Sequence, residues 1–402
     1  MPDEGRERRK ELISKIEEKR DSKLITYVTG DRPGLQMQIA QDAIPILYQH
    51  ILECRKDDKC KFDLLLYSRG GHSDVPWGIV SMFRECSPNG TFSVLIPYRA
   101  HSAATLIALG ADEIIMTEKG ELGPVDATTY GPYNEKDPKS GLPLPISVED
   151  VKGYFSLLNK NVGGGRAEEQ LKSFELLTSK VHPLALGTVN RRLDETRLVA
   201  ERLLKTRKEP FADDVNQDIA NKLSSEIYSH DHTIGRTEAM EYVGLKQVKR
   251  AEGAGIDKEL WALYCEYRNL FDLEKPFTAE AELVEQNIDQ NQWNGLKVAC
   301  VESAHRFDLL THNLKVSFGR MIPPQFMINM TAPFQPVINI PNLPPNLPPD
   351  VILQLIQQTV ERVVQQALNN AAQVAIRELQ RSLPIAMVSR QMMSGSGWNR
   401  VE

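Results

Sequence analysis

A serine and a pair of glycines are the residues of this chain whose types and positions could support a chemical reaction. Ser102 lies in "PYRAHSAATLIALGADEIIM" (97–116), and the diglycine Gly70–Gly71 lies in "SRGGHSD" (68–74). A serine hydroxyl can attack an acyl carbon, and backbone N–H groups without a partner can hold the resulting oxyanion. The two segments therefore suggest acyl chemistry if the fold brings them together.

The elements around these segments predict where they lie. Apolar strands and helices are expected to alternate over 24–29, 36–54, 62–67, 75–86, 91–98, 103–110 and 113–116. This alternation predicts an α/β protein with a parallel sheet covered by helices on both faces. Loops that follow neighbouring parallel strands share one edge of the sheet. The diglycine loop and the Ser102 loop should therefore meet.

The residues alone leave the role of Ser102 open. Because Gly70 and Gly71 have no Cβ, their N–H groups can approach a substrate carbonyl. The N–H groups of Ala103 and Ala104 begin a helix and have no acceptor inside it. Serine is, however, also a favoured helix N-cap that contributes about 1 kcal/mol. A diglycine after a strand is often only a tight turn.

Four segments give the chain a resemblance to a known family. "LLLYSRGG", "PYRAHSAATLIALGADEIIM", "GELGPVD" (120–126) and "YSHDHTIGRTEAMEYVGL" (228–245) resemble the serine dehydrogenase proteinases, which are related to signal peptide peptidase SppA. The resemblance covers roughly residues 10–250. It implies the ClpP/crotonase fold, a spiral of strand–strand–helix units, and assembly into oligomers. By position it implies that Ser102 is the nucleophile and that Gly71 and Ala103 supply the oxyanion-hole amides.

Two positions depart from the family pattern. Arg69 stands where relatives usually have proline, and Ala104 stands where many have glycine. If the latter position required a positive φ, alanine there would be strained.

The general base is the least defined part of the predicted site. The ClpP histidine has no counterpart in "LGPVDAT" (122–128), which offers only Asp126. We predict Lys152, at about the spacing of the lysine in a bacterial SppA, and such a lysine must be desolvated to work near neutral pH. Its neighbours Val151 and Tyr154 favour this, whereas the adjacent carboxylates oppose it. Other candidates are Lys180, His182 and the pair His230–Asp231, with His101 and His72 less suited.

Composition excludes several other functions. The net charge is −6, no apolar run is long enough to cross a membrane, and the N-terminus has no signal-peptide pattern. We therefore expect no nucleic-acid or membrane partner and a cytoplasmic location. The five cysteines form no C-x-x-C motif and are expected to be reduced. His230 and His232 lack an evident third ligand, so neither a metal nor another cofactor is predicted.

The remaining chain divides into five predicted parts. A charged helix (1–22) precedes the catalytic domain (23–255), and an α/β extension of uncertain packing (256–332) follows it. A Pro-rich linker (333–350) leads to an amphipathic helix within 351–402, whose last dozen residues should be frayed. The apolar stripe of that helix predicts self-association into a homo-oligomer.

The sequence thus predicts a serine peptidase that acts on peptide or protein substrates through an acyl-enzyme. Two alternatives remain. A crotonase-like acyl-transfer enzyme would need no serine. A catalytically inactive Clp-fold scaffold or regulator would act through oligomerisation and partner binding.

Overall fold

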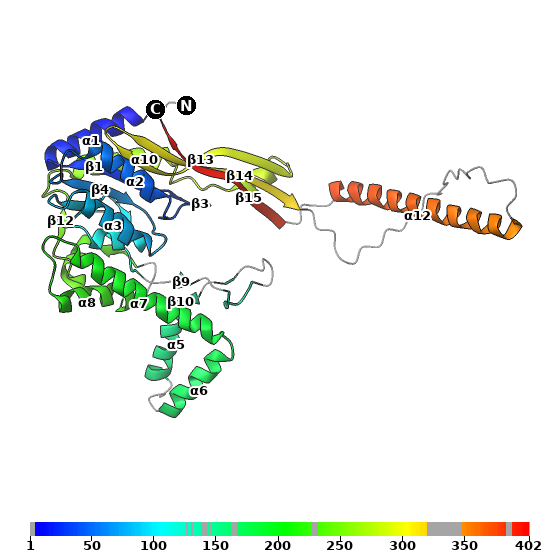
Figure 1. Cartoon of the computed structure of the whole chain (residues 1–402), viewed down its shortest axis with the longest axis horizontal. Coiled ribbons are helices and arrows are strands. Elements are labelled where there is room, and N and C mark those ends of the chain that lie inside the picture. Colours follow the sequence, from blue (N-terminus) through cyan, green and yellow to red (C-terminus); the bar gives the residue numbers. More distant parts are fainter. Residues whose placement is uncertain are drawn as a thin grey trace. The chain divides into compact units, whose positions relative to one another are not determined.

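The structure is a computed structural model of the whole chain (Figure 1). It describes residues 5–125, 128–129, 132–137, 143–144, 146–161, 167–226, 232–319, 348–382 and 388–401.

The framework is an eight-stranded sheet in the order β12-β7-β5-β4-β1-β13-β14-β15. The strands from β12 to β1 run parallel, and β13 pairs with β1 in the antiparallel direction. Five of the strands are β1 (Lys23–Thr29), β4 (Phe62–Tyr67), β5 (Phe92–Ile96), β7 (Glu113–Met116) and β12 (Val248–Arg250). The other three are β13 (Gln290–Ser303), β14 (Phe307–Gly319) and β15 (Val388–Arg400).

Helices cover both faces of this sheet, as the sequence predicts. Side chains of β4 alternate between two cores: Leu64 and Leu66 face one, and Leu65 and Tyr67 face the other. The first core packs under α2 (Ala43–Cys54), α3 (Val75–Cys86), α4 (Ala103–Leu109), α7 (Pro183–Lys205) and α8 (Asp213–Asn221). The second packs under α1 (Arg6–Arg20) and α10 (Asp257–Leu270). This double coverage explains why the central strands are continuous apolar runs.

A second, short sheet lies beside the ends of the main strands. It has the order β11-β8-β6, with the bounds β6 (Arg99–Ala100), β8 (Glu121–Leu122) and β11 (Ile234–Gly235). The succession β5, β6, α4 is therefore a strand–strand–helix unit, and the predicted fold class is confirmed. The other short strands are β2 (Asp31–Arg32), β3 (Leu35–Gln36), β9 (Thr128–Thr129) and β10 (Ile146–Ser147).

The helical region predicted from about 148 to 208 is also present. It consists of α5 (Val148–Asn161), α6 (Ala167–Thr178) and α7, and the glycines at 163–165 lie outside the described residues. The remaining helical turns are η1 (Lys222–Glu226), α9 (Arg236–Glu238), η2 (Ala239–Val243) and α11 (Ala279–Glu285).

The C-terminal residues differ from their prediction. A frayed tail is wrong, because Val388–Arg400 forms β15 at the edge of the main sheet. The indole N–H of Trp398 donates to Asp42 at 2.8 Å, and the backbone N–H of Val401 donates to the carbonyl of Phe307 at 2.9 Å. A strand edge has unpaired backbone groups, and the tail satisfies those of β14. The segment of uncertain packing is likewise placed, since β13 pairs with β1.

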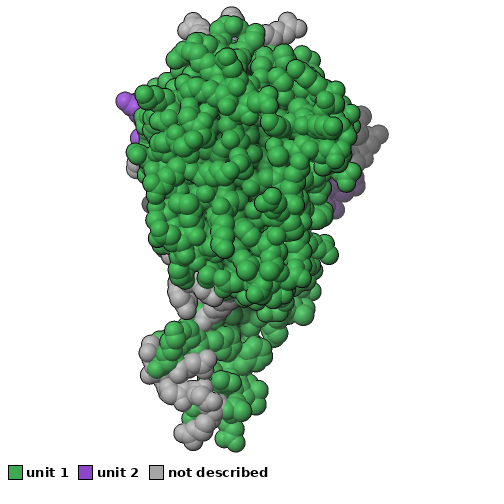
Figure 2. Space-filling view, turned by 90° about the vertical axis from the view of Figure 1, so that its left-hand side faces the viewer, with its two compact units in different colours: residues 1–277, 295–312, 395–402 green, residues 278–294, 313–394 purple. Residues whose placement is uncertain are grey.

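Two compact units make up the chain, coloured separately in Figure 2. The first contains residues 1–277, 295–312 and 395–402, and the second contains 278–294 and 313–394. The second includes the predicted long helix, α12 (Pro349–Ser382). The Pro-rich segment lies outside the described residues except for 348–350. Among the described helices, none is long and apolar enough to span a membrane.

Candidate active site

The diglycine loop and the Ser102 loop meet at one edge of the sheet. The backbone N–H of Ser68 donates to the carbonyl of Arg99 at 3.0 Å, and that of His101 donates to the carbonyl of Ser68 at 3.1 Å. These bonds form a parallel bridge between the two loops. The predicted meeting of the loops is therefore confirmed.

Both glycines are required by their surroundings. Gly70 has a φ of +109°, and a Cβ there would lie 2.8 Å from the Cβ of Ser102 and from the carbonyl oxygen of His101. A Cβ on Gly71 would lie 2.3 Å from the carbonyl oxygen of Ile39. Any larger residue would separate the loop from Ser102 or from Ile39. The diglycine is thus a close contact and not only a turn.

Ser102 has a strained backbone and does not cap its helix. Its φ is 50° and its ψ is −113°, a combination that costs a non-glycine residue on the order of 1–3 kcal/mol. Although it occupies the N-cap position of α4, its side chain makes no cap hydrogen bond. The residue is half-buried. The side-chain N-cap interpretation is wrong, because the hydroxyl of Ser102 makes no hydrogen bond to the N–H groups at the start of α4.

Two of the four candidate amides are already occupied. The N–H of Gly70 donates to the hydroxyl of Ser68 at 2.9 Å, and that of Ala104 donates to the carbonyl of His101 at 2.9 Å. Within the described part of the chain, the N–H groups of Gly71 and Ala103 have no such acceptor. The unoccupied donors are the pair that the family resemblance indicates.

The departure at Ala104 causes no strain. The residue lies inside α4 and is not among the described residues with positive φ. The glycine that many relatives have at this position is therefore not needed for the backbone conformation of this chain.

A charged network lies beside the two loops. The carboxylate of Asp31, whose side chain is only 5% exposed, accepts from the hydroxyl of Tyr67 at 2.7 Å, from Nε of Arg69 at 2.9 Å and from Nη1 of Arg99 at 2.8 Å. Nε of Arg99 also donates to Glu121 at 3.2 Å. Arg69, the residue at the position of the family proline, is therefore held by an ion pair.

These contacts set the ionisation of the two carboxyl groups. Burial favours neutral Asp31, but the hydrogen bonds from Tyr67 and Arg69 and the charge of Arg99 outweigh it and lower its pKa. Burial opposes ionisation of Glu121 as well, yet His101 and Arg99 hold the pKa of that carboxyl below its usual range. Both groups are therefore carboxylates at neutral pH.

His101 faces Glu121 and packs on the loop that follows it. Its Nε2 lies 3.2 Å from Oε1 of Glu121, close enough for an ion pair, but the two atoms are not aligned for a hydrogen bond. A Cβ on Gly123 would lie 2.9 Å from Cγ of the His101 ring. The contact of His101 with Glu121 is electrostatic.

The structure describes some of the candidates for the general base and not others. Lys152 lies on α5, and its side chain is outside those that the structure describes. The preceding Val151 packs against Val189 and Leu193 of α7. Lys180 is exposed beyond the end of α6.

The histidine candidates fare differently. His182 is the N-cap of α7: its Nδ1 accepts from the N–H of Leu184 at 3.2 Å, and its ring stacks on Tyr133. This contact assigns His182 a structural role. His230 and Asp231, like Asp126, lie outside the described residues. His72 is exposed.

Of the two histidines considered as metal ligands in the sequence, His230 lies outside the described residues and His232 lies within them. His232 is exposed, and its Nε2 lies 2.8 Å from Glu238. No group of three or more potential ligands among the described histidines, cysteines, aspartates and glutamates could hold a metal ion.

Sequence reasoning missed the residues that fix the loops. Ser68 is fully buried and accepts from the hydroxyl of Thr29 at 2.7 Å while it holds the N–H of Gly70. Thr29 is the last residue of β1, and Asp31 follows two residues later as the first residue of β2. The available signal was polar residues directly after apolar strands, at the edge where the loops were expected.

Comparison with known proteins supports the resemblance. Residues 3–134 match the family described as ClpP-like SDH-type serine proteinase. The predicted resemblance to this family is therefore confirmed over this part of the chain, which includes the diglycine, Ser102 and the region up to Asn134.

The individual relatives and solved structures that match this chain share little sequence identity with it. Two uncharacterized proteins of Methanocaldococcus jannaschii match: one is 26% identical over 43% of this chain and 47% of its own length, and the other is 25% identical over 58% and 71%. The chain thus aligns with about half of the first relative. Two structures of the 1510-N membrane-bound stomatin-specific protease, one a lysine-to-alanine variant with a substrate peptide and one a serine-to-alanine variant, are each 16% identical over 55% of this chain. The matches span 73% and 77% of the two solved chains, with TM-scores of 0.31 and 0.29.

Proposed function

From the family match over residues 3–134, we propose that this protein is a serine peptidase that cleaves peptide bonds through an acyl-enzyme on Ser102. The observation that carries the proposal is the backbone of Ser102, which is strained, forms no helix cap and lies against Gly70. Strain of this kind persists only where the surroundings impose it, and it is common at catalytic residues.

The proposed reaction uses the hydroxyl of Ser102 and two amides. The oxygen of Ser102 attacks the peptide carbonyl while its proton moves to a general base. The N–H groups of Gly71 and Ala103 stabilise the oxyanion of the tetrahedral intermediate, and each such donor typically contributes on the order of 100- to 1,000-fold in rate. The base then gives the proton to the leaving amine. Water attacks the ester that remains and releases the second product.

Lys152 is the base that we propose, and its spacing from Ser102 supports it. The packing of Val151 on α7 also places that end of α5 against an apolar surface. A lysine that acts as a base must be poorly solvated, because desolvation favours the neutral amine that the role requires. Lys152→Ala should therefore abolish turnover, whereas exposed Lys180→Ala should leave it intact.

The substrates that we propose are peptides and unfolded protein segments. The scissile bond must lie between the diglycine loop and Ser102, and a folded domain presents few segments that fit two converging loops. Casein and a denatured globular protein should be cleaved, and the same globular protein in its native state should resist cleavage.

A serine-directed fluorophosphonate tests the proposal directly. The full-length protein should be labelled at Ser102, and Ser102→Ala should not be labelled. Labelling that is absent in the intact protein, with partner binding unchanged by Ser102→Ala, would support the scaffold alternative. Acyl-transfer activity that survives Ser102→Ala would support the crotonase-like alternative.

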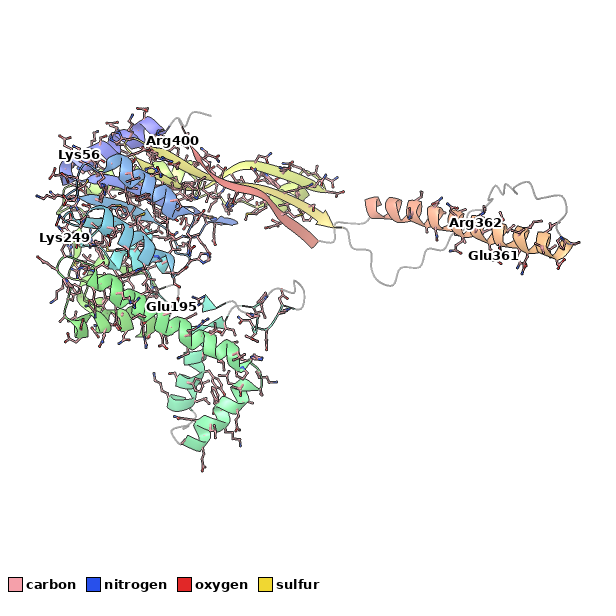
Figure 3. The ribbon with its side chains drawn as sticks, in the orientation of Figure 1. Lys56, Glu195, Lys249, Glu361, Arg362 and Arg400 are labelled. Atoms are coloured by element: carbon pink, nitrogen blue, oxygen red, sulfur yellow. The ribbon has the colours of Figure 1, made fainter. Side chains whose placement is uncertain are left out.

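We also propose that α12 mediates self-association. Its apolar side chains include Leu353, Leu355, Leu368 and Val374, all of them exposed, and none of the described side chains of α12 is buried. The polar face is rich in glutamine, with Glu361 and Arg362 exposed on it (Figure 3). Few basic residues lie on this helix, which favours a second copy of the helix over an anionic membrane surface.

Replacement of apolar residues within the full chain is the appropriate test of this contact. Val360→Gln with Val363→Gln should reduce the mass measured by light scattering. Gln358→Ala with Gln365→Ala is the matched control on the polar face. Truncation at residue 349 is unsuitable because it also removes β15. An unchanged mass in the valine variant would exclude self-association through this stripe.

A further inference from the structure

We propose that Asp31 is a positioning residue that holds the two loops of the proposed active site in register through Arg69 and Arg99. The inference rests on the proposed function, because it concerns how the oxyanion hole reaches its geometry. Asp31 is the first residue of β2, two residues after the end of β1, and lies outside both loops.

One oxygen of Asp31 joins the two loops. Oδ2 accepts from Nε of Arg69 at 2.9 Å and from Nη1 of Arg99 at 2.8 Å. Arg69 immediately precedes the diglycine, and Arg99 lies three residues before Ser102. The carboxylate therefore connects the loop that carries the Gly71 amide to the loop that carries the nucleophile.

The other oxygen fixes the carboxylate itself. Oδ1 accepts from the hydroxyl of Tyr67 at 2.7 Å, and Tyr67 is a fully buried residue of β4. The tyrosine ring packs against the rings of Tyr98 and Tyr264, with centroid distances of 6.1 and 5.1 Å. Asp31 is thus held by an aromatic cluster, and it connects the two turns to that cluster through Arg69 and Arg99.

Arg99 is further constrained by its own contacts. Its guanidinium lies 4.3 Å from the centroid of the Tyr98 ring, and its Nη2 donates to the hydroxyl of the same tyrosine. Its Nε donates to Glu121 at 3.2 Å. Three of its nitrogens are therefore engaged, so a displacement of Asp31 cannot be absorbed by a simple rotation of Arg99.

This arrangement matters because the proposed oxyanion hole spans two loops. The N–H of Gly71 comes from one loop and that of Ala103 from the other, so their separation depends on how the loops are joined. Backbone bonds at Ser68 join them directly, and Asp31 joins them through the side chains of Arg69 and Arg99. A displacement of about 1 Å at such a site can reduce a rate on the order of 100-fold.

Asp31→Asn is the central variant. The amide retains the shape of the side chain but removes the charge that both guanidinium groups share. We expect the first-order rate of fluorophosphonate labelling at Ser102 (kinact) to fall about 10- to 100-fold. The reversible affinity for the probe (KI) should change less than about threefold, because Asp31 does not contact the substrate. Asp31→Glu should restore part of the rate.

A double-mutant cycle tests the path of the effect. Arg69→Met should reduce kinact less than Asp31→Asn, since Arg99 keeps its partner. The double variant should be close to Asp31→Asn alone, because the two residues act through one contact. Asp21→Asn removes an exposed carboxylate that pairs with Lys61 at 2.7 Å, away from both loops, and serves as the matched control.

The outcomes separate the two proposals. An intact protein that is not labelled at Ser102 would overturn the proposed function and the role of Asp31 together. Normal labelling of both the intact protein and Asp31→Asn would overturn only the role of Asp31. A lower melting temperature with kinact unchanged well below it would show that Asp31 serves stability alone. Additive losses in the double variant would refute the shared contact with Arg69.

Discussion

Two serines of this protein differ in their surroundings. Ser303 has the histidine and aspartate partners expected of a nucleophile, whereas Ser102 lies beside the diglycine loop at the edge of the sheet. Ser303 hydrogen-bonds Nδ1 of His50 at 3.0 Å, and Nε2 of His50 contacts Asp308 at 2.9 Å. By residue type and distance this is a Ser–His–Asp arrangement. Ser303 and His50 are, however, fully buried, and no substrate can reach them. Ser102 is half-buried and lies against a diglycine loop.

A catalytic serine needs access to substrate and donors for the oxyanion as well as suitable partner residues, and the Ser303 cluster lacks that access. The cluster around Ser303 connects α2, which carries His50, to the strands β13 and β14. Arg306 pairs with Asp308 and balances its charge. The Ser303 cluster therefore contributes to stability, whereas the strain at Ser102 opposes it.

The largest expected difference between the two serines is in reactivity. Ser102→Ala should reduce peptide hydrolysis by at least about 1,000-fold, because the nucleophile is lost. Ser303→Ala should leave hydrolysis within about twofold below its melting temperature, because only a buried hydrogen bond is lost. Initial rates of casein cleavage by both variants test this expectation. Hydrolysis that depends on Ser303 would reverse the assignment.

A smaller effect is expected from the diglycine loop. Gly70→Ala places a Cβ in contact with Ser102 and requires a positive φ, so the loop must shift. We expect the turnover number to fall about 10- to 100-fold, mainly through displacement of the Gly71 amide. Gly187→Ala in α7 has open space for its Cβ and is the control. Full activity of Gly70→Ala would exclude a close functional contact between the loops.

The third prediction concerns the buried cluster. His50→Gln should lower the free energy of unfolding by about 1–3 kcal/mol, because it removes partners from buried Ser303 and Asp308. Fluorophosphonate labelling of Ser102 at low temperature should be unchanged. Denaturant unfolding and the labelling rate, measured on the same preparation, distinguish this result from a shared active site, in which both quantities would fall.

The same cluster predicts the acid sensitivity of the protein. Burial lowers the pKa of His50 in the folded protein. As the pH drops below about 6.5, the unfolded chain therefore takes up a proton at His50 before the folded protein does, and the free energy of unfolding should fall. Despite burial, His50 and Arg306 lower the pKa of Asp308 to about 2. The stabilisation from ionised Asp308 is present above about pH 3.9, the pKa of aspartate in the unfolded chain, and it is lost as the pH falls toward 2. In His50→Gln the first of these losses should disappear.

The smallest expected effect is relief of strain at Ser102. Glycine adopts a positive φ at little cost. The free energy of unfolding of Ser102→Gly should therefore be about 1 kcal/mol higher than that of Ser102→Ala. Ser303→Gly should be less stable than Ser303→Ala, because Ser303 is the last residue of β13 and pairs there with Ile25 of β1. Equal stability of the two Ser102 variants in urea would contradict the strain argument.

Much of the fold could be predicted because the signal is periodic. Apolar runs such as 62–67 and 113–116 are strands in the structure, and the helix over 75–86 has the predicted bounds. The meeting of Gly70 with Ser102 followed from the rule that loops after neighbouring parallel strands share an edge. The tail was mispredicted because polar residues at 388–400 give no such period, and their pairing with β14 is a long-range contact.

The polar network could not be predicted for a related reason. Arg69 is a mismatch when it is compared with the family pattern alone. Its partner Asp31 is far away in the sequence, and nothing local indicates that Arg99 shares the same carboxylate. Likewise, Ser303, His50 and Asp308 come from α2 and a distant strand pair, so only the folded chain brings them together.

The sequence by itself determined the α/β class, the order of the central strands and helices, and the two loops that carry the proposed site, because each depends on local hydrophobic period and turn chemistry. The tertiary structure alone decided that Ser102 is strained and does not cap α4, which amides remain without acceptors, and that Asp31 joins both loops. Those features depend on the positions of atoms from strands far apart in the chain, and no local pattern specifies such distances.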